Sequence, residues 1–140
     1  MTETVLGLRA CIDVDNLDEG IRFYTQALGL KVGRRYKEGW VELLGAPSPI
    51  DLVAKPAGSP ASPALPQARD YRRHWTPVHL DFVVTDLEAS VQKAQDAGAK
   101  REGDIKTYSW GRIAVFADPF GHGFCLLQFT GRGYDEMLGG

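Results

Sequence analysis

The sequence has 140 residues, of which 44% are hydrophobic and 24% are charged, and its net charge at pH 7 is −2. These values are typical of one globular domain and exclude collagen-like, coiled-coil and disordered chains. Because no basic run is present to neutralise phosphates, we expect no nucleic acid partner. No apolar run approaches the ~20 residues of a membrane span, and the start lacks a signal-peptide pattern. We therefore expect no membrane association and a cytoplasmic location, where Cys11 and Cys125 are free thiols.

The first half of the chain has the apolar spacing of a β-α-β-β-β unit. A helix is predicted from Leu17 to Leu28, because Asn16 is a good N-cap and Gly29 a good C-terminal stop. Alternation of apolar and polar residues predicts strands over residues 5–14, 30–36, 40–44 and 50–55.

The second half repeats this order at an offset of 70 positions, so that segment 8–18 matches segment 78–88 and Arg9 falls on His79. A repeat of this kind implies two copies of one supersecondary unit. The predicted elements are a strand over 74–84, a helix from 87 to about 98, an edge strand over 100–107, and two strands over 112–117 and 123–129. The turn Asp118-Pro119-Phe120-Gly121 predicts that the last two strands form a hairpin.

Two segments stand outside the repeat. Residues 56–73 contain four prolines among small residues, which indicates a linker with an extended, exposed first half and a short helical turn in its second half. A connection of this length can also be a lid over a site, although a tether is the simpler interpretation. The glycine-rich tail, residues 131–140, is expected to be either loose or packed on a partner chain.

The chain resembles the vicinal-oxygen-chelate superfamily, which contains glyoxalases, extradiol dioxygenases, fosfomycin-resistance transferases and bleomycin-resistance proteins. The resemblance rests on the repeated unit, on the Phe23-Tyr24-x-x-x-Leu28-Gly29 helix end and on the closing Asp118-Pro119-Phe120-Gly121-His122 turn. It implies an α+β fold. Residues 1–140 would form a single domain of two tandem βαβββ modules, 5–55 and 74–130, with curved mixed sheets around a cavity. It also implies a homodimer.

The same resemblance implies four ligand positions on the inward faces of the sheets. These are Arg9 and His79 on the first strands, and Asp51 and Cys125 on the last strands. In metal-dependent members these positions are typically histidine (or glutamine) and glutamate. Only His79 is of the expected type.

Strand alternation agrees that these side chains share a face with other polar residues. The predicted pocket lining is Arg9, Cys11, Asp13, Asp51, His79, Asp81 and Cys125. His79 taken alone would more often be a hydrogen-bonded structural histidine, and the repeat favours a role in the pocket.

Imidazole, carboxylate and thiolate groups bind zinc, so His79, Asp51 and Cys125 could supply three ligands. Arg9 opposes this, because its guanidinium is always protonated and stands where a further ligand is expected. It can instead form an internal ion pair with Asp51 or hold an anionic ligand. We therefore predict no metal and no cofactor. His122 is expected to be a solvated turn residue rather than a ligand.

A second resemblance concerns Trp110-Gly111-Arg112, which precedes Asp118. The arrangement looks like that of bleomycin-resistance proteins, which are dimers that bind a drug without metal chemistry. Trp110 would offer a flat surface to an aromatic or cationic ligand, although tryptophans are also common in protein cores. The excess of aspartates over Arg9 in the predicted lining also favours a cationic or polar ligand.

Three functions follow as alternatives. The first is metal-independent sequestration of an aromatic or cationic small molecule by a homodimer, with these binding residues: Arg9, Cys11, Asp51, His79, Asp81, Trp110 and Cys125. The second is a metal-dependent lyase, isomerase or dioxygenase with an altered ligand set, and the third is a domain that only dimerises or holds a partner. No catalytic residue is assigned, because the sequence shows no nucleophile–base pair and no phosphate-binding glycine pattern.

Overall fold

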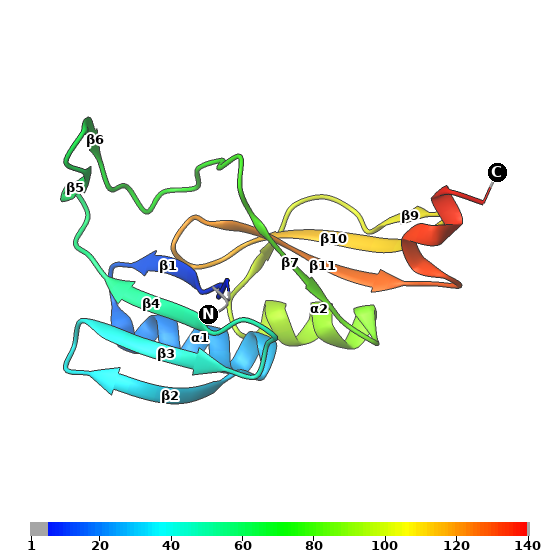
Figure 1. The fold of residues 1–140 in the computed structure, drawn as a ribbon, viewed down its shortest axis with the longest axis horizontal. Helices are drawn as coiled ribbons and strands as arrows, with labels where there is room; N and C mark the ends of the chain where they lie inside the picture. Colours follow the sequence, from blue (N-terminus) through cyan, green and yellow to red (C-terminus); the bar gives the residue numbers. More distant parts are fainter. Residues whose placement is uncertain (1–5, 140) are drawn as a thin grey trace, which may run out of the picture. The chain divides into compact units, whose positions relative to one another are not determined.

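The computed structural model of the chain describes residues 6–139. These residues form two compact units. The first unit comprises the described residues up to Thr25 and the segment Gly29–Asp70. The second unit comprises Gln26–Leu28 and the chain from Tyr71 onward. Each unit contains one main sheet, in which a strand and a helix are followed by further strands as in the predicted β-α-β-β-β order (Figure 1). Within residues 6–139, no helix is long and apolar enough to cross a membrane.

The first unit contains a four-stranded sheet. Its elements are β1 (Ala10–Val14), α1 (Leu17–Leu28), β2 (Lys31–Tyr36), β3 (Trp40–Leu44) and β4 (Ile50–Ala54). The strand order is β1-β4-β3-β2. β1 is parallel to β4, and the other pairs are antiparallel.

The second unit repeats this topology. Its elements are β7 (Leu80–Val83), α2 (Leu87–Asp96), β8 (Lys100–Arg101), β9 (Lys106–Tyr108), β10 (Gly111–Ala117) and β11 (Gly123–Phe129). The strand order is β7-β11-β10-β8, with β9 also beside β10 and with β7 parallel to β11. Because α1 and α2 begin 70 residues apart, the sequence repeat is a structural repeat.

α1 begins at the predicted cap, Asn16, and α2 begins after Asp86, the residue at the equivalent position of the repeat. The Asn16 side chain accepts a hydrogen bond from the backbone N–H of Glu19 at 3.0 Å, and Asp86 accepts one from Ala89 at 3.1 Å. These bonds satisfy N–H groups that the first helical turn leaves without partners. α1 ends before Gly29, whose φ of 70° favours glycine.

One face of each sheet packs on the helix of its own unit. A Cβ added to Gly20 of α1 would stand 3.0 Å from the Leu52 side chain and 3.2 Å from that of Val14, which shows how closely α1 covers β1 and β4. In the second unit α2 contacts β10 and β11, and the side chains of Phe116 and Leu126 are fully buried. The opposite face of each sheet carries the predicted site residues.

Three strand boundaries differ from the prediction. β1 begins at Ala10 rather than at residue 5, and residues 1–5 lie outside the described part of the chain. β7 begins at Leu80 rather than at residue 74, because Leu80 already pairs with the second residue of β11 and the preceding segment has no neighbouring strand. The predicted edge strand 100–107 is two short strands, β8 and β9, with Gly103 at a φ of 89° between them.

The linker is more ordered than the sequence indicated. β5 (Pro60–Ser62) and β6 (Leu65–Ala68) form a two-stranded hairpin. The backbone N–H of Gly58 donates to the Arg69 carbonyl at 2.7 Å and closes the base of this hairpin. The second half of the linker forms no helical turn, because Leu65–Ala68 is paired as strand β6 and residues 69–73 are neither helix nor strand.

The turn between β10 and β11 forms as predicted. The N–H of Gly121 donates to the Asp118 carbonyl at 3.2 Å. Gly121 has a φ of 82°, and an added Cβ would stand 2.4 Å from the Arg72 carbonyl oxygen. Only glycine fits here, because the end of the linker packs directly on the turn.

Candidate functional site

The face of the first sheet that lies away from α1 is polar, as predicted. Residues directly opposite each other on neighbouring strands point to the same face, and the registers set Cys11 and Glu42 on either side of Asp51. Glu42 and Asp51 are only 5% and 8% exposed. Carboxylates buried to this extent need charged partners.

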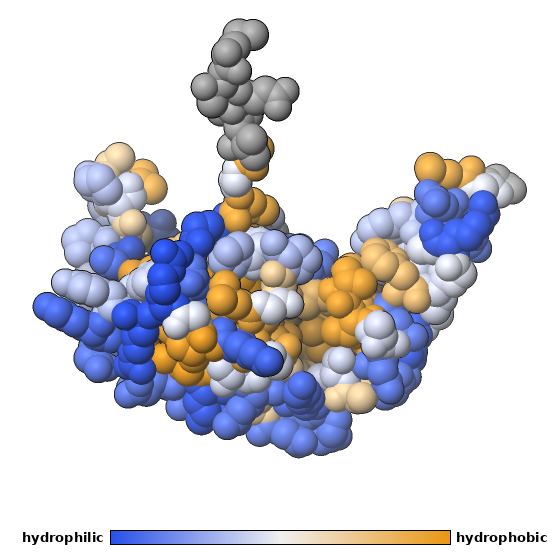
Figure 2. Space-filling model, turned by 60° about the horizontal axis from the view of Figure 1, so that its bottom comes forward, coloured by the Kyte–Doolittle hydropathy of each residue, from blue (hydrophilic) through white to orange (hydrophobic). Residues whose placement is uncertain are grey.

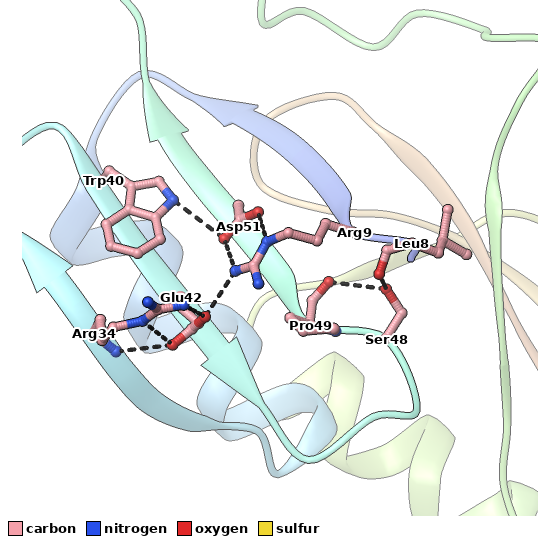
Figure 3. A network of polar contacts seen from close by, with 8 residues as sticks. All are labelled: Leu8, Arg9, Arg34, Trp40, Glu42, Ser48, Pro49 and Asp51. Atoms are coloured by element: carbon pink, nitrogen blue, oxygen red, sulfur yellow. Dashed lines mark hydrogen bonds and ion pairs between the residues drawn. The ribbon is translucent and has the colours of Figure 1, made fainter. Parts of the chain in front are cut away.

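Arginines supply these partners (Figure 3). Nε and Nη2 of Arg9 donate to Oδ2 and Oδ1 of Asp51 at 2.8 and 2.6 Å, and Nη2 also donates to Oε2 of Glu42 at 2.8 Å. Arg34 donates to both oxygens of Glu42, from Nε at 3.0 Å and from Nη2 at 2.7 Å. Trp40 donates its indole N–H to Oδ1 of Asp51 at 3.1 Å. We refer to these five residues as the arginine–carboxylate network.

The network keeps its carboxylates ionised. Hydrogen bonds from Arg34 and Arg9 hold the pKa of Glu42 far below its usual range, and a hydrogen bond from Arg9 lowers the pKa of Asp51. The same bonds raise the pKa of Arg9. Two positive and two negative side chains balance, so the network has no net charge with which to attract an ion.

The arginine–carboxylate network does not fit a metal ion. Of the two ligand positions that the family resemblance implies in this unit, one holds the Arg9 guanidinium and the other, Asp51, uses both oxygens to bind it. A divalent ion would have to replace these charge-assisted bonds and then stand beside a permanent positive charge. Of the two roles considered for Arg9, the structure shows the internal ion pair.

The carboxylate of Asp13 is also paired with an arginine. Arg69, at the base of the β5–β6 hairpin, donates Nε to Oδ2 of Asp13 at 2.7 Å and Nη1 to Oγ of Ser59 at 3.3 Å. Asp13 and Asp51 are thus both paired with arginines, which weakens the charge argument for a cationic ligand. Cys11 lies between them and is exposed, and desolvation together with the two carboxylates raises the pKa of its thiol.

The second sheet presents a different surface on the side away from α2. The registers place Val83 beside Leu127, Val115 opposite Cys125, and Ile113 opposite Leu127. Val83 and Val115 are 59% and 37% exposed. We refer to this surface as the apolar face, which consists of Val83, Ile113, Val115, Leu127 and Phe129.

His79, Asp81 and Cys125 lie together at one end of the apolar face. Nδ1 of His79 is 3.1 Å from Oδ1 of Asp81, and ligand-type atoms of all three residues lie within 4.8 Å of one another. Burial raises the pKa of Cys125 to about 11, with a contribution from the Asp81 carboxylate, which also accepts a hydrogen bond from the thiol. Asp51, the third zinc ligand considered from the sequence, belongs to the other unit and is paired with Arg9.

This cluster has donor types that bind zinc, but its contacts oppose a metal. Zinc binds the thiolate, so a metal would have to remove the proton of Cys125, whose pKa burial raises to about 11, and displace both contacts of Asp81.

Trp110 lies at the other end of the apolar face. Its ring stacks on Tyr108 with centroids 5.4 Å and planes 3° apart, and its centroid is 6.1 Å from that of Phe129. Tyr134, from a short 3-10 helix in the tail (η1, Gly133–Met137), lies 5.0 Å from Trp110. The tail thus packs on its own unit. Figure 2 shows hydrophobic surface next to this C-terminal segment, at the right of the view.

Sequence reasoning missed Glu42 and Arg34. A signal for Glu42 was present, because it is a charged residue between Val41 and Leu43, and alternation sets it on the polar face. Arg34 had no such signal, since β2 carries a bulge between Val32 and Arg35 that interrupts the alternation.

His122 lies in the turn as expected, but it is half-buried rather than fully solvated. Its Nδ1 is 3.0 Å from Nε2 of His74, and Nδ1 of His74 is 2.8 Å from the Arg72 carbonyl oxygen. The two imidazoles connect the end of the linker to the turn, which is a structural role.

Comparison with known proteins identifies the family. A family model described as a glyoxalase-like domain matches residues 9–127. The chain belongs to this family. An uncharacterized protein of Mycobacterium bovis is 44% identical over 54 residues, which are 38% of this chain and 36% of that protein. The chain spans about a third of the length of the curated relatives it matches.

Solved structures confirm the predicted α+β vicinal-oxygen-chelate fold. The fosfomycin resistance protein FosX from Listeria monocytogenes aligns with a TM-score of 0.66 and 16% identity, over 93% of this chain and 96% of that protein. Lactoylglutathione lyase from Agrobacterium tumefaciens aligns with a TM-score of 0.62 and 14% identity, over 91% of this chain and 95% of that protein. At these identities the likeness concerns the fold alone.

Proposed function

We propose that this glyoxalase-like domain binds a flat, largely apolar small molecule on the apolar face of its second unit, without a metal. The observation that carries the proposal is the stacked Tyr108–Trp110 pair at one end of that face. A stacked, partly exposed pair offers a ring surface to an aromatic ligand and attracts cations to its π-system. Exposed Val83 and Val115 continue the apolar surface towards Asp81.

Two tricyclic probes test this function, because they share a ring system and differ in charge. We expect both acridone, which is neutral, and proflavine, which is a cation, to bind in titration calorimetry. Trp110→Phe should weaken both severalfold, because the larger ring surface is lost. Trp75→Phe is the matched control, since Trp75 is 78% exposed. Equal affinities in the wild type and Trp110→Phe would contradict the proposal.

The proposed independence from metal is supported by the pairing of Arg9 with Asp51 and Glu42. We expect elemental analysis after dialysis to find no stoichiometric divalent metal. Cys125→Glu adds a carboxylate beside His79 and Asp81 within the second unit and should increase affinity for zinc or manganese. Cys125→Ser is the control. Near-stoichiometric metal in the wild type would refute metal independence.

A metal-dependent lyase, isomerase or dioxygenase is the second candidate. The observation that favours it is the approach of donor atoms from His79, Asp81 and Cys125 to within 4.8 Å of one another. Tight zinc binding that Cys125→Ser abolishes would support this candidate. A domain without any ligand, the third alternative, predicts that neither probe binds and that zinc does not bind either.

A further inference from the structure

Asp81 is held in place from two sides. It lies on β7 in register with Cys125 of β11, and its carboxylate accepts a hydrogen bond from the Cys125 thiol. The Asp81 carboxylate therefore lies between Cys125 and His79, with Oδ1 3.1 Å from Nδ1 of His79.

The two ring nitrogens of His79 have different surroundings. Nδ1 is 3.1 Å from Oδ1 of Asp81, so we assign the proton of the neutral ring to Nδ1, where the carboxylate stabilises it. The lone pair then lies on Nε2. The side chain is 46% exposed, and within residues 6–139 the ring has no other hydrogen-bonding partner. Nε2 is accessible to a bound molecule.

The apolar face could hold a flat molecule next to this imidazole. At the ~3.3 Å rise per residue of a strand, Phe129 lies roughly 13 Å along β11 from Cys125. A molecule of two or three fused rings placed between Trp110 and His79 would cover Val83 and Val115. Such a molecule would exclude water from the imidazole, and a general base is more effective when water is excluded.

We propose that His79 is a general base, positioned by Asp81, that removes a proton from a flat, largely apolar substrate on the apolar face. The proposal rests on the proposed function, in which this face holds an aromatic molecule. Nε2 takes the proton of an activated C–H or O–H bond, the bonding electron pair stays on the substrate, and Asp81 stabilises the imidazolium. Return of the proton to another atom of the same molecule completes an isomerisation, which needs no metal, oxidant or covalent intermediate.

Nitrobenzisoxazole is a probe for this chemistry, because it is a planar aromatic C–H acid. The base removes the ring C–H proton, the electron pair forms the nitrile, the N–O bond breaks, and the coloured cyanophenolate leaves while the base returns its proton to water. We expect the wild type to open the ring faster than buffer does. His79→Gln should remove roughly 100-fold or more of the acceleration, a typical contribution of a positioned base. His74→Gln is the matched control and should retain the acceleration.

Asp81 acts through His79, so its test needs a separate readout. Asp81→Asn should lower kcat with little change in KM, and nitrogen NMR of the imidazole should show that Nδ1 is no longer the preferred protonation site. Asp81→Glu should restore part of both signals. A change in KM alone would indicate a merely structural role and would contradict the positioning role.

Binding is measured on the same samples, so that the two proposals can fail separately. If the probe competes with acridone for the face and is not turned over faster than in buffer, the general-base proposal is wrong and the binding function stands. If neither molecule binds, both are wrong. Activity that a chelator abolishes, or equal rates for the wild type and His79→Gln, would also overturn the general base.

Discussion

Glu42 is a buried carboxylate whose charge depends on two arginines, and this dependence makes the first unit sensitive to acid. A glutamate in the unfolded chain protonates near pH 4.3. The folded-state pKa of Glu42 is far lower, because Arg34 and Arg9 donate hydrogen bonds to it. Between these two pKa values the unfolded chain binds more protons than the folded chain. The contribution of Glu42 to the free energy of unfolding is therefore fully present above pH ~4.3 and is lost as the pH falls below it.

We therefore expect the melting temperature of the wild type to fall steeply below pH ~4. Glu42→Gln should melt several degrees lower at neutral pH, because its neutral amide pairs less strongly with the arginines, and should show a flatter acid profile. Thermal unfolding across this range checks both, with Glu38→Gln as the exposed control. Parallel profiles for the wild type and Glu42→Gln would contradict the assignment.

The two cysteines should differ in reactivity. Cys11 is exposed and Cys125 is buried, and the pKa of each thiol is raised. Because the thiolate is the reactive form, we expect an aromatic disulfide reagent at pH 8 to label Cys11 slowly and Cys125 only after denaturation. Cys11→Ser should abolish labelling of the folded protein. Labelling of a second thiol without denaturant would contradict the burial of Cys125.

At the scale of elements, the β5–β6 hairpin depends on one side chain outside its own strands. Arg69 connects the base of the hairpin to Asp13 on β1. We expect Arg69→Ala to increase the rate of limited proteolysis within residues 56–70, because the hairpin loses this attachment. Gln67→Ala, at an exposed position on β6, is the control. Equal cleavage rates in the two variants would show that Arg69 does not hold the hairpin.

The sequence was sufficient for the helices and for the faces of the strands. Caps such as Asn16 and Asp86 act on N–H groups within one turn, so their signal is local. The two-residue period of a strand is fixed by the backbone, and it placed Asp51 and Cys125 on the faces where the structure has them.

Pairing across long sequence separations could not be predicted in the same way. Arg9 and Asp51 were considered as a pair, yet the bond from Arg9 to Glu42 depends on the register between β3 and β4. The length of β7 depends on where β11 begins, and the hairpin in the linker forms from residues whose prolines indicate an extended tether. Such features depend on the partner strand, and the sequence of the segment itself does not indicate which strand that is.

At the scale of the whole molecule we expect a homodimer. Each unit has one helix on one face of its sheet, and large apolar side chains such as Val32 and Leu138 are exposed in the single chain. Light scattering at micromolar concentration should give twice the 15.4 kDa of one chain. A dilution series separates a stable dimer from weak association. A mass of 15.4 kDa throughout the series would refute the dimer.

The positions of the tryptophans allow the unfolding of each unit to be followed by its own spectroscopic signal. Trp40 donates a hydrogen bond to buried Asp51 in the first unit, and Trp110 stacks on Tyr108 in the second. Exposed Trp75 is the third tryptophan, so Trp75→Phe leaves one indole in each unit. In that variant, the near-ultraviolet circular dichroism of the stacked rings reports the unfolding of the second unit. The fluorescence emission maximum also reports the first unit, because it shifts when Trp40 loses its hydrogen bond to Asp51. A single coincident transition in both signals would mean that the two halves of the repeat unfold cooperatively, and two transitions would mean that each half is stable by itself.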